Sequence, residues 1–553
     1  MKHLLLTLLI IFAASTLPAQ PKHEVRAVWL TTIGGIDWPH SYAYNNRTIE
    51  KQKNELRDIL DRLQRANINT VLLQTRVRAT AIYPSLYEPW DGCLSGNPGK
   101  SPGYDALRFA IDECHSRGME IHAWIVTIPV GKWNSYGCAR LRKKHPGLIC
   151  KIGQEGYMNP EKAQTATYLA DMCGEIVSNY DVDGIHLDYI RYPETWPIKV
   201  SRQQGRKNIT NIVRAIHRRV KSIKPWVKMS CSPVGKHDDL SRYDSHGWNA
   251  YTRVCQDARG WICEGLMDML FPMMYFRDNN FYPFALDWAE NAHGRTIVPG
   301  LGIYFMSPKE KDWPLSDITR EMEVLRSYGM GHAFFRSKFF TDNVKGIYDY
   351  AYDIFNRYPA LIPPMTWERS SLPPAPASLQ RNRTNDHTAI LSWSPVDKDT
   401  TRISYNVYSS RQYPVDIYDA RNLIAIRRHS AQMPIPTDST RYYAVTAIDR
   451  YGNESPARQE AQPKLLPTPC DKRLTDRFLP CDGKTLMLPA LCNVLDADFL
   501  IIESLQGTMI SSRPFSRAKT DVSRLNDGVY VLRALGRKGV NHRLGYFAIR
   551  RRF

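Results

Sequence analysis

Three aspartates, a histidine and an arginine lie close together in residues 181–193, DVDGIHLDYIRYP. Polar and apolar residues alternate here as in a buried β-strand, so His186 and Asp188 share one face. A carboxyl group buried at a strand end is costly unless a cation or a function compensates for it. Asp188 is therefore the first candidate for a catalytic carboxyl, with structural pairing to Arg191 as the alternative. Asp183 stands where the strand begins, and a turn or capping role is the better interpretation.

The place of Asp188 in the fold depends on the strands around it. Between residues 24 and 358, short apolar segments alternate with amphipathic helical patterns, several of which end at a glycine. This order predicts an α/β fold, a (β/α)₈ TIM barrel. An open doubly wound sheet is the alternative, but it would need a glycine-rich phosphate loop, which TTIGGIDWP lacks. The eight predicted strands are residues 24–32, 69–77, 120–128, 182–190, 227–234, 267–276, 296–305 and 331–337.

In such a barrel the active site lies at the C-terminal ends of the strands, so polar and aromatic residues there are the site candidates. His122 and His186 lack a third ligand at metal-binding spacing, and hydrogen bonding is the better interpretation for both. Aromatic rings gathered at one rim are typical of sugar stacking, although each alone would as readily be a core residue. These candidates are Asp37, Trp38, Arg76, Tyr83, Trp90, His122, Trp124, His186, Asp188, Arg191, Tyr275, Asp278 and Tyr304.

Seven motifs follow one another over residues 24 to about 358: EVRAVWLTTIGGIDWP, LLQTRVRATAIYPSLYEPW, GYDALRFAIDECHSRGMEIHAW, YDVDGIHLDYIRYP, CSPVG, FPMMYF and PGLGIY. In this order and spacing they resemble the glycosyl-hydrolase-like family ten, an exported bacterial group of (β/α)₈ proteins. Some members are similar to enzymes that cleave peptidoglycan glycan strands. The resemblance implies the barrel and places these residues along the cleft: Gln74, Arg76, Tyr83, Trp90, His122, Trp124, Asp188, Arg191, Tyr192 and Tyr275. Two segments depart from the family pattern: IVTIPVGKW follows HAW, and FPMMYF stands in place of a glutamine-bearing PQ segment. These departures leave the identity of the bound sugar open.

The leading hypothesis is an exported glycoside hydrolase acting on a polysaccharide, with peptidoglycan glycan strands as the first substrate to test. Glycoside hydrolysis normally uses one carboxyl as proton donor and a second as nucleophile or base. Asp188 is the candidate for one role, and Asp278, Glu88 and Asp37, in that order, are candidates for the other. An N-acetyl group of the substrate acting as nucleophile is a further alternative. Ile190 stands where chitinase-type barrels have a glutamate, which argues against a direct copy of that mechanism.

Two other classes of protein are alternatives. A non-catalytic glycan-binding protein would keep the cleft and lack a catalytic carboxyl. A metal-dependent deacetylase would need a clustered His/Asp triad, which the sequence does not show. We expect a polysaccharide partner, cell-surface or cell-wall association as an option, and no cofactor or metal. The formal charge of +19 is spread along the whole chain, so nucleic acid is not an expected partner.

The N-terminus MKHLLLTLLIIFAASTLPAQ indicates a signal peptide over residues 1–20, because a basic start precedes an apolar run too short to span a bilayer. We therefore expect export to the periplasm, the cell surface or the medium. The chain has 11 cysteines, an odd number, so at least one is unpaired or pairs between chains.

Four further segments follow the signal peptide. The barrel is expected over residues 21–360, followed by a proline-rich linker over 361–375. LSWSPV, YNVYSS and YYAVTAIDRYGNES resemble a fibronectin type III module over 376–465. Weaker strand patterns predict a second small all-β domain over 466–553.

Overall fold

The computed structural model describes residues 20–241, 243, 247–385, 387–397, 402–437, 440–461, 478–488, 497–505, 507–536 and 541–550 of the chain. The predicted signal peptide lies outside the described residues up to position 19. The chain divides into two units, each described by itself. The first comprises residues 1–373 together with 425–428 and 448–454, and the second comprises the rest.

The first unit is built on one sheet of short parallel strands, in the order β11-β10-β9-β8-β4-β2-β1-β13-β12, with the antiparallel β3 beside β2. The bounds are β1 (Arg26–Leu30), β2 (Thr70–Val77), β3 (Thr80–Ala81), β4 (Glu120–Val126), β8 (Gly184–Asp188), β9 (Lys228–Cys231), β10 (Met269–Leu270), β11 (Thr296–Ile297), β12 (Gly300–Leu301) and β13 (His332–Phe334). Each of the eight predicted strands contains an observed one, and the seventh is split into β11 and β12.

The two ends of this sheet are joined through the seventh strand. Only Val298 and Pro299 separate β11 from β12. The amide of Val298 donates to the carbonyl of Leu270 at 2.8 Å, and the amide of Ala333 donates to the carbonyl of Pro299 at 3.0 Å. The sheet therefore curls into a closed ring, and the predicted α/β barrel is confirmed.

The strands on either side of this junction are shorter than predicted. Residues 267–276 were expected as one strand, but β10 covers only Met269–Leu270. Pro272 and Pro299 interrupt this part of the ladder, because proline has no amide proton to donate to a neighbouring strand. The sixth to eighth strands are thus joined by fewer hydrogen bonds than β2, β4 and β8.

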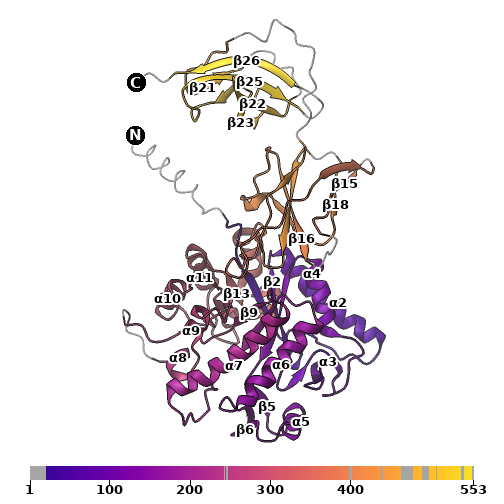
Figure 1. The fold of residues 1–553 in the computed structure, drawn as a ribbon, viewed down its shortest axis with the longest axis vertical. Helices are drawn as coiled ribbons and strands as arrows, with labels where there is room; N and C mark the ends of the chain where they lie inside the picture. Colours follow the sequence, from indigo (N-terminus) through magenta and orange to yellow (C-terminus); the bar gives the residue numbers. More distant parts are fainter. Residues whose placement is uncertain are drawn as a thin grey trace. The chain divides into compact units, whose positions relative to one another are not determined.

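Helices connect the strands on the outside of the sheet, and Figure 1 shows α6 and α7 side by side there. The side chain of Asn45 accepts from the amide of Thr48 at 3.0 Å at the start of α2, and Ser201 caps α7 in the same way. The helices of this unit are α2 (Asn46–Arg65), α3 (Gly92–Ser95), α4 (Ala106–Ser116), α5 (Tyr136–Lys144), α6 (Ala163–Asn179), α7 (Arg202–Ile223), α8 (Ala250–Arg253), α9 (Ala258–Cys263), α10 (Tyr282–Glu290), α11 (Leu315–Ser327), α12 (Ser337–Thr341) and α13 (Ile347–Tyr350).

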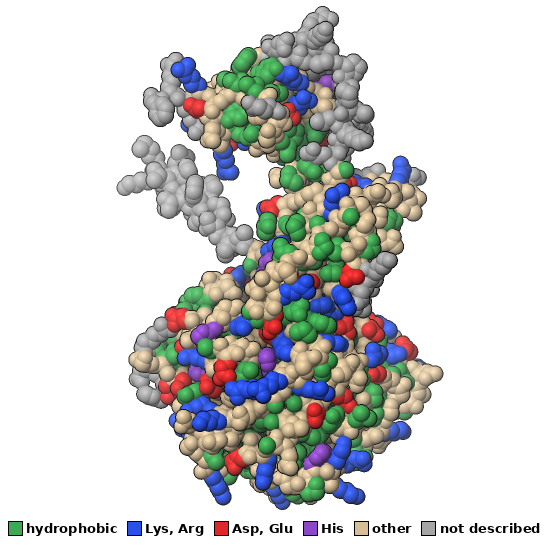
Figure 2. Space-filling view, in the orientation of Figure 1, with side chains coloured by type: hydrophobic (Ala, Val, Ile, Leu, Met, Phe, Trp, Pro, Cys, Tyr) green, Lys and Arg blue, Asp and Glu red, His purple; other side chains and the backbone are tan. Residues whose placement is uncertain are grey.

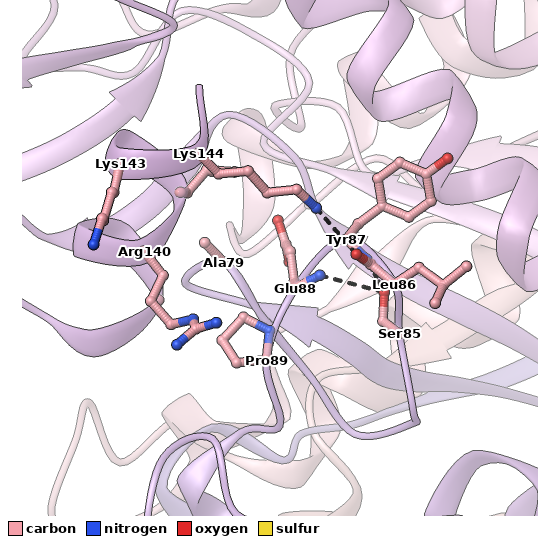
Figure 3. A pocket seen from close by; sticks show the side chains of 11 residues that line it. Ala79, Ser85, Leu86, Tyr87, Glu88, Pro89, Arg140, Lys143 and Lys144 are labelled. Carbon is pink, nitrogen blue, oxygen red and sulfur yellow. Dashed lines mark hydrogen bonds between the residues drawn. The ribbon is translucent and has the colours of Figure 1, made fainter. Parts of the chain in front are cut away.

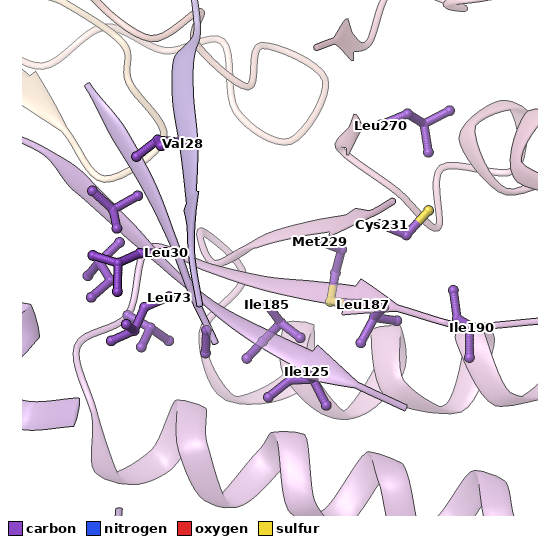
Figure 4. Packing of buried hydrophobic residues seen from close by; sticks show 14 of the residues in the cluster. Val28, Leu30, Leu73, Ile125, Ile185, Leu187, Ile190, Met229, Cys231 and Leu270 are labelled. Carbon is purple, nitrogen blue, oxygen red and sulfur yellow. The ribbon is translucent and has the colours of Figure 1, made fainter. Parts of the chain in front are cut away.

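The strands bury both faces, which explains their nearly continuous apolar sequences. One set of alternating residues, including Leu30, Leu73 and Leu187, packs between the strands and the helices (Figure 4). The other set faces the inside of the barrel and includes Trp29 and Trp124. Asp188 belongs to this second set, since it follows His186 at the two-residue period of a strand.

An excursion follows β4 before the chain returns to α6. The strands β5 (Pro129–Lys132), β6 (Ile149–Ile152) and β7 (Glu155–Met158) form a small antiparallel sheet, and α5 lies within it in sequence. Gly137 on α5 comes so close to the chain after β2 that an added Cβ would lie 2.5 Å from the carbonyl oxygen of Ala79. Only a glycine permits this approach.

The chain beyond residue 378 forms the two predicted small all-β parts. The expected linker begins as part of the first unit, where the Trp367 indole donates to Asp268 at 2.8 Å. A three-stranded and a four-stranded sheet come first, formed by β14 (Leu379–Arg383), β15 (Thr388–Trp393), β16 (Ile403–Ser410), β17 (Leu423–Arg428), β18 (Gln432–Pro436), β19 (Tyr442–Asp449) and β20 (Arg458–Gln459). The last part contains β21 (Thr485–Met487), β22 (Phe499–Ser504), β23 (Met509–Pro514), β24 (Lys519–Asp521), β25 (Gly528–Leu535) and β26 (Asn541–Ile549).

Three further features are the distribution of basic side chains, the state of the cysteines and the character of the helices. Lysine and arginine side chains are scattered over the visible face of the molecule instead of forming one patch (Figure 2). The nine cysteines whose structure is described are free thiols, and Cys470 and Cys492 lie outside the described residues. Within the described ranges, no helix has both the length and the apolar character needed to cross a bilayer.

Candidate active site

Asp188 ends β8 with its side chain inside the barrel, and it is 7% exposed. Its Oδ1 accepts hydrogen bonds from the Ser232 hydroxyl at 2.9 Å and from the amide of Tyr189 at 2.8 Å. Its Oδ2 accepts one bond, from the indole Nε1 of Trp124 at 3.1 Å. The three donors come from β4, from the turn after β8 and from the chain after β9. The carboxyl is thus held in one orientation by three neighbouring strands.

Burial and hydrogen bonding shift the pKa of this carboxyl in opposite directions. Burial in the barrel raises the pKa of Asp188 above its ordinary value, although Ser232, Arg191, the Tyr189 amide and Trp124 favour the charged form. Since Oδ1 already accepts two bonds and Oδ2 only one, Oδ2 is the oxygen with capacity for a proton. Asp188 therefore keeps its proton to a higher pH than an exposed aspartate. Three hydrogen-bond donors already contact the carboxyl and can stabilise its charged form.

Aromatic rings surround the end of the barrel around Asp188. Tyr275 lies 5.8 Å from Tyr304 and 5.3 Å from Phe335 between ring centroids. Burial raises the pKa of Tyr275 well above its ordinary value, and the negative charge of Asp188 adds to this effect. The rings of Tyr189, Tyr275, Tyr304 and Phe335 are each only partly buried. Together they give the site an apolar rim with exposed ring surface.

His186 lies one step deeper in the barrel than Asp188 and is fully buried. The indole of Trp29 donates to its Nε2 at 3.3 Å, so the ring proton belongs on Nδ1, which donates to the Ser230 hydroxyl at 3.0 Å. Burial lowers the pKa of His186 well below its ordinary value. It is a neutral packing residue in the barrel interior beneath Asp188.

The turn after β8 positions both Tyr189 and Arg191. Tyr189 has a φ of 51°, a left-handed conformation that is uncommon for a residue with a side chain. The turn lets its amide point back at Asp188. Arg191 stacks on the Tyr189 ring at 4.4 Å and donates to Glu194 at 2.6 Å. Its positive charge favours the ionised form of Asp188 without a direct hydrogen bond.

Gln74 and Asp37 hold the loop after β1 instead of facing a substrate. The Gln74 side-chain oxygen accepts from the amides of Thr32 and Ile33 at 3.0 and 2.8 Å. One oxygen of Asp37 accepts from the amide and hydroxyl of Thr31 at 3.0 and 2.8 Å, and the other pairs with Arg336. Asp37 is therefore already engaged on both oxygens.

Arg76 and Glu88 form a buried ion pair. The guanidinium Nη2 of Arg76 lies 2.6 Å from Glu88 Oε1, and the Tyr168 hydroxyl donates to the same oxygen at 3.1 Å. Arg76 also donates to the carbonyl of Thr127 at 2.7 Å, and the Thr127 hydroxyl donates to the carbonyl of Asp188 at 2.8 Å. This pair supports the end of β4, the strand between β2 and the Asp188 strand.

The other predicted site residues lie away from Asp188. Trp38, Tyr83 and Tyr192 are buried in the layer between strands and helices, and Trp90 packs against its edge. His122 is buried four residues before the position of β4 that pairs with Asp188, and it lies 3.3 Å from Glu120. The polar atoms of the first three pair with long-range partners: Trp38 with the carbonyl of Gln52, Tyr83 with Glu175, and Tyr192 with Asn208.

Asp278 is exposed at the start of a short 3₁₀ turn, η2 (Asp278–Asn280). No hydrogen bond or ion pair in the described part of the chain joins it to Asp188. Ser232 was missed by the sequence analysis, although it follows β9 directly and the strand-end rule would have found it. Phe335 was missed for the same reason, just after β13. Among the described residues, no group of three or more His, Cys, Asp or Glu side chains is arranged to hold a metal ion.

Comparisons with known proteins bear on the barrel. Residues 24–204 and 196–311 match the family described as glycosyl hydrolase-like 10. Glycosyl hydrolase YngK of Bacillus subtilis strain 168 is 28% identical over 487 residues, which cover 79% of this chain and 93% of YngK. Glycosyl hydrolase DigH of Escherichia coli K12 is 31% identical over 349 residues, which cover 55% of this chain and 79% of DigH. Among solved structures, an α-L-fucosidase from Paenibacillus thiaminolyticus aligns at a TM-score of 0.41 with 14% identity, covering 60% of this chain and 49% of its own.

Proposed function

Because this chain belongs to the glycosyl hydrolase-like 10 family, we propose that it is a glycoside hydrolase in which Asp188 protonates the leaving glycosidic oxygen. The observation that supports this most directly is the setting of Asp188, a buried carboxyl with a raised pKa and three fixed donors at the C-terminal end of a barrel strand. In the indicated barrel fold, this end of the strands is where active sites form.

The same setting explains how the proton would be transferred. In the proposed mechanism Asp188 donates its proton from Oδ2, and burial favours this protonated form. As the glycosidic oxygen takes that proton, Asp188 becomes a carboxylate, and hydrogen bonds to a charged group are roughly twice as strong as neutral ones. Ser232, Trp124 and the Tyr189 amide therefore stabilise the product of the transfer more than its starting state, as catalysis requires.

The rim supports a polysaccharide as the substrate. The partly exposed rings of Tyr189, Tyr275, Tyr304 and Phe335 can pack against the C–H faces of sugar rings. Peptidoglycan glycan strands are the substrate we propose first, on the strength of the family motifs. We also propose that the N-terminal signal peptide directs export of the protein. The fibronectin type III-like module would act as a spacer or as a binding module.

Only one carboxyl is assigned in this mechanism. Glu88 is paired with Arg76 and Asp37 with Arg336, so neither is a free base. An N-acetyl group on the substrate, acting as nucleophile, would supply the second group without another carboxylate.

The test is hydrolysis of purified glycan strands by the full chain, measured as release of reducing ends. We expect Asp188→Asn to abolish release, while Asp112→Asn, a change at an exposed aspartate on the outer helix α4, leaves it intact. Loss of release in Asp278→Asn would support Asp278 as the second carboxyl. Binding of the strands should survive in Asp188→Asn. If the parent protein binds glycan strands but releases no reducing ends, the non-catalytic glycan-binding alternative replaces this proposal.

A further inference from the structure

The amide of Tyr189, which donates to Asp188 Oδ1 at 2.8 Å, belongs to the peptide group that joins these two residues. A trans peptide group is planar, so its carbonyl and its N–H point in opposite directions. The carbonyl of Asp188 accepts two hydrogen bonds from Thr127, one from the amide at 2.9 Å and one from the side-chain hydroxyl at 2.8 Å. These two bonds therefore also orient the Tyr189 amide toward Oδ1.

The backbone at Tyr189 needs such support from its neighbours. Its φ of 51° lies in the left-handed region, which is unfavourable for a residue with a side chain. A conformation of this kind persists only where surrounding contacts hold it. The bonds from Thr127 act on the carbonyl just before Tyr189, and Thr127 is fully buried, so water does not compete for them.

Arg76 holds Thr127 by the same geometry. Its Nη1 donates to the carbonyl of Val126 and, at 2.7 Å, to the carbonyl of Thr127. The carbonyl of Val126 and the amide of Thr127 belong to one peptide group, so a bond to this carbonyl directs the amide the opposite way, toward Asp188. Two peptide groups thus connect the guanidinium of Arg76 to the carboxyl of Asp188.

The guanidinium of Arg76 is itself fixed on the helix side of the sheet. Its Nε and Nη2 donate to Glu88 at 2.9 and 2.6 Å, and Tyr168 of α6 donates to the same carboxylate at 3.1 Å. Glu88 also lines a pocket of about 570 Å³ beside α5 (Figure 3). Arg76 is fully buried, and the contacts that lead from it to Asp188 run through the backbone.

We infer that Thr127 is a positioning residue of the proposed hydrolase: anchored by Arg76, it orients the Tyr189 amide toward the carboxyl that donates the proton. This inference rests on the proposed function and adds a residue that contacts the backbone of Asp188 and not its carboxyl group. When Asp188 gives up its proton, the oriented amide meets a full negative charge, and its hydrogen bond becomes stronger. A poorly oriented amide would stabilise the carboxylate less.

The test compares three variants of the full chain. Thr127→Val removes the hydroxyl from a side chain of similar shape, and Thr127→Ser returns a hydroxyl. Thr75→Val is the matched control, because Thr75 is also fully buried and its hydroxyl donates to the carbonyl of Leu73 at 2.9 Å on β2. Each valine variant loses one buried bond from a hydroxyl to a carbonyl, so both should lose similar stability in urea unfolding.

Two measurements separate positioning from stability. Infrared spectra recorded at a series of pH values follow protonated carboxyls, and the band missing from Asp188→Asn belongs to Asp188. This titration needs no turnover. Initial rates of reducing-end release give kcat and KM separately.

None of the titratable groups around Asp188 is altered by these variants. They are Arg191 and Tyr189 in the turn after β8, Cys231 on β9 and Tyr275 after β10. Burial raises the pKa of Tyr189, Cys231 and Tyr275, so these three groups titrate well above Asp188. A shift in the Asp188 titration therefore reports a change in its hydrogen-bond donors.

We expect the Asp188 titration to move up by about half a pH unit in Thr127→Val, since its carboxylate loses part of a donor. Half a unit is about a threefold change in the proton-transfer equilibrium, so kcat should fall about threefold while KM is unchanged. Thr127→Ser should restore both values, and Thr75→Val should leave both at the parental level.

A parental Asp188 titration in Thr127→Val, or an equal shift in Thr75→Val, would overturn the inference. If the parent protein releases no reducing ends, the hydrolase proposal fails, and the infrared titration still decides whether Thr127 orients a donor to Asp188.

Discussion

Ser232 offers the sharpest test of how Asp188 works, because its hydroxyl contacts only the oxygen of Asp188 that is already fully engaged. The bond from Ser232 Oγ to Asp188 Oδ1 is 2.9 Å long and buried. A hydrogen bond to a charged group contributes about 1.5–3 kcal/mol, and one to a neutral group about 1 kcal/mol. Ser232→Ala should therefore cost the ionised form of Asp188 about 1 kcal/mol more than the protonated form.

Two measurable effects follow from this difference. The proton transfer becomes harder by about 1 kcal/mol, so kcat/KM should fall roughly fivefold. Loss of a donor to the carboxylate also raises the pKa of Asp188 further, and a general acid works only while protonated. The alkaline limb of the pH profile of kcat/KM should therefore move to higher pH in Ser232→Ala.

The assay is the pH dependence of reducing-end release in the parent and three variants. Ser232→Thr keeps a hydroxyl and should retain most of the parental profile. Ser230→Ala removes a hydroxyl that contacts His186 instead of Asp188, and should leave the alkaline limb in place. A profile that moves to lower pH in Ser232→Ala, or that does not move at all, would refute the assignment of Asp188 as the acid.

Three further predictions concern stability. Glu321 is buried with neither carboxylate oxygen hydrogen-bonded, and burial raises its pKa well above the ordinary value, with Asp317 and Asp278 acting in the same direction. Because the pKa of Glu321 is higher in the folded than in the unfolded protein, folding is most favourable below the unfolded pKa and weakens as pH rises through the folded pKa. Glu321→Gln should therefore stabilise the protein at neutral pH by about 1–3 kcal/mol. The same change should flatten the pH dependence of the free energy of unfolding in urea. Arg76→Met should destabilise by about 3–5 kcal/mol, since it leaves the buried Glu88 charge unpaired, and adding Glu88→Leu should recover much of this in the same urea assay. Gly137→Ala should lower the melting temperature, because its Cβ would lie 2.5 Å from a carbonyl oxygen; an unchanged melting temperature would contradict the close packing of α5.

The barrel could be predicted from sequence because its signal is local. Each strand is a short run of buried residues between helical patterns, and all eight predicted segments contain an observed strand. Strand length was less predictable, since it depends on which amides meet a neighbour. Pro272 and Pro299 lack an amide proton, so they shorten the hydrogen-bonded part of the sixth and seventh strands, although the apolar residues of these segments continue beyond it.

The position of Asp188 at a strand end was predictable, and its surroundings were less so. The strand-end rule finds Asp188, Trp124 and Tyr275 because it needs only their position in the chain. It also selects Tyr83, which is turned away from the barrel interior toward Glu175, a partner 92 positions further along the chain. No local pattern distinguishes a polar residue that faces a cleft from one whose partner is supplied by a distant helix.

The junction at Pro299 gives the two sides of the proposed cleft different stiffness. Around Asp188 the strands β4, β8 and β9 pair residue by residue, and they carry the acid and its donors. Around Tyr275 and Phe335 the strands are two or three residues long and lack the amides of Pro272 and Pro299. Local opening in proteins begins where backbone hydrogen bonds are fewest. In the proposed hydrolase, the aromatic wall would thus shift more readily than the strands that hold Asp188.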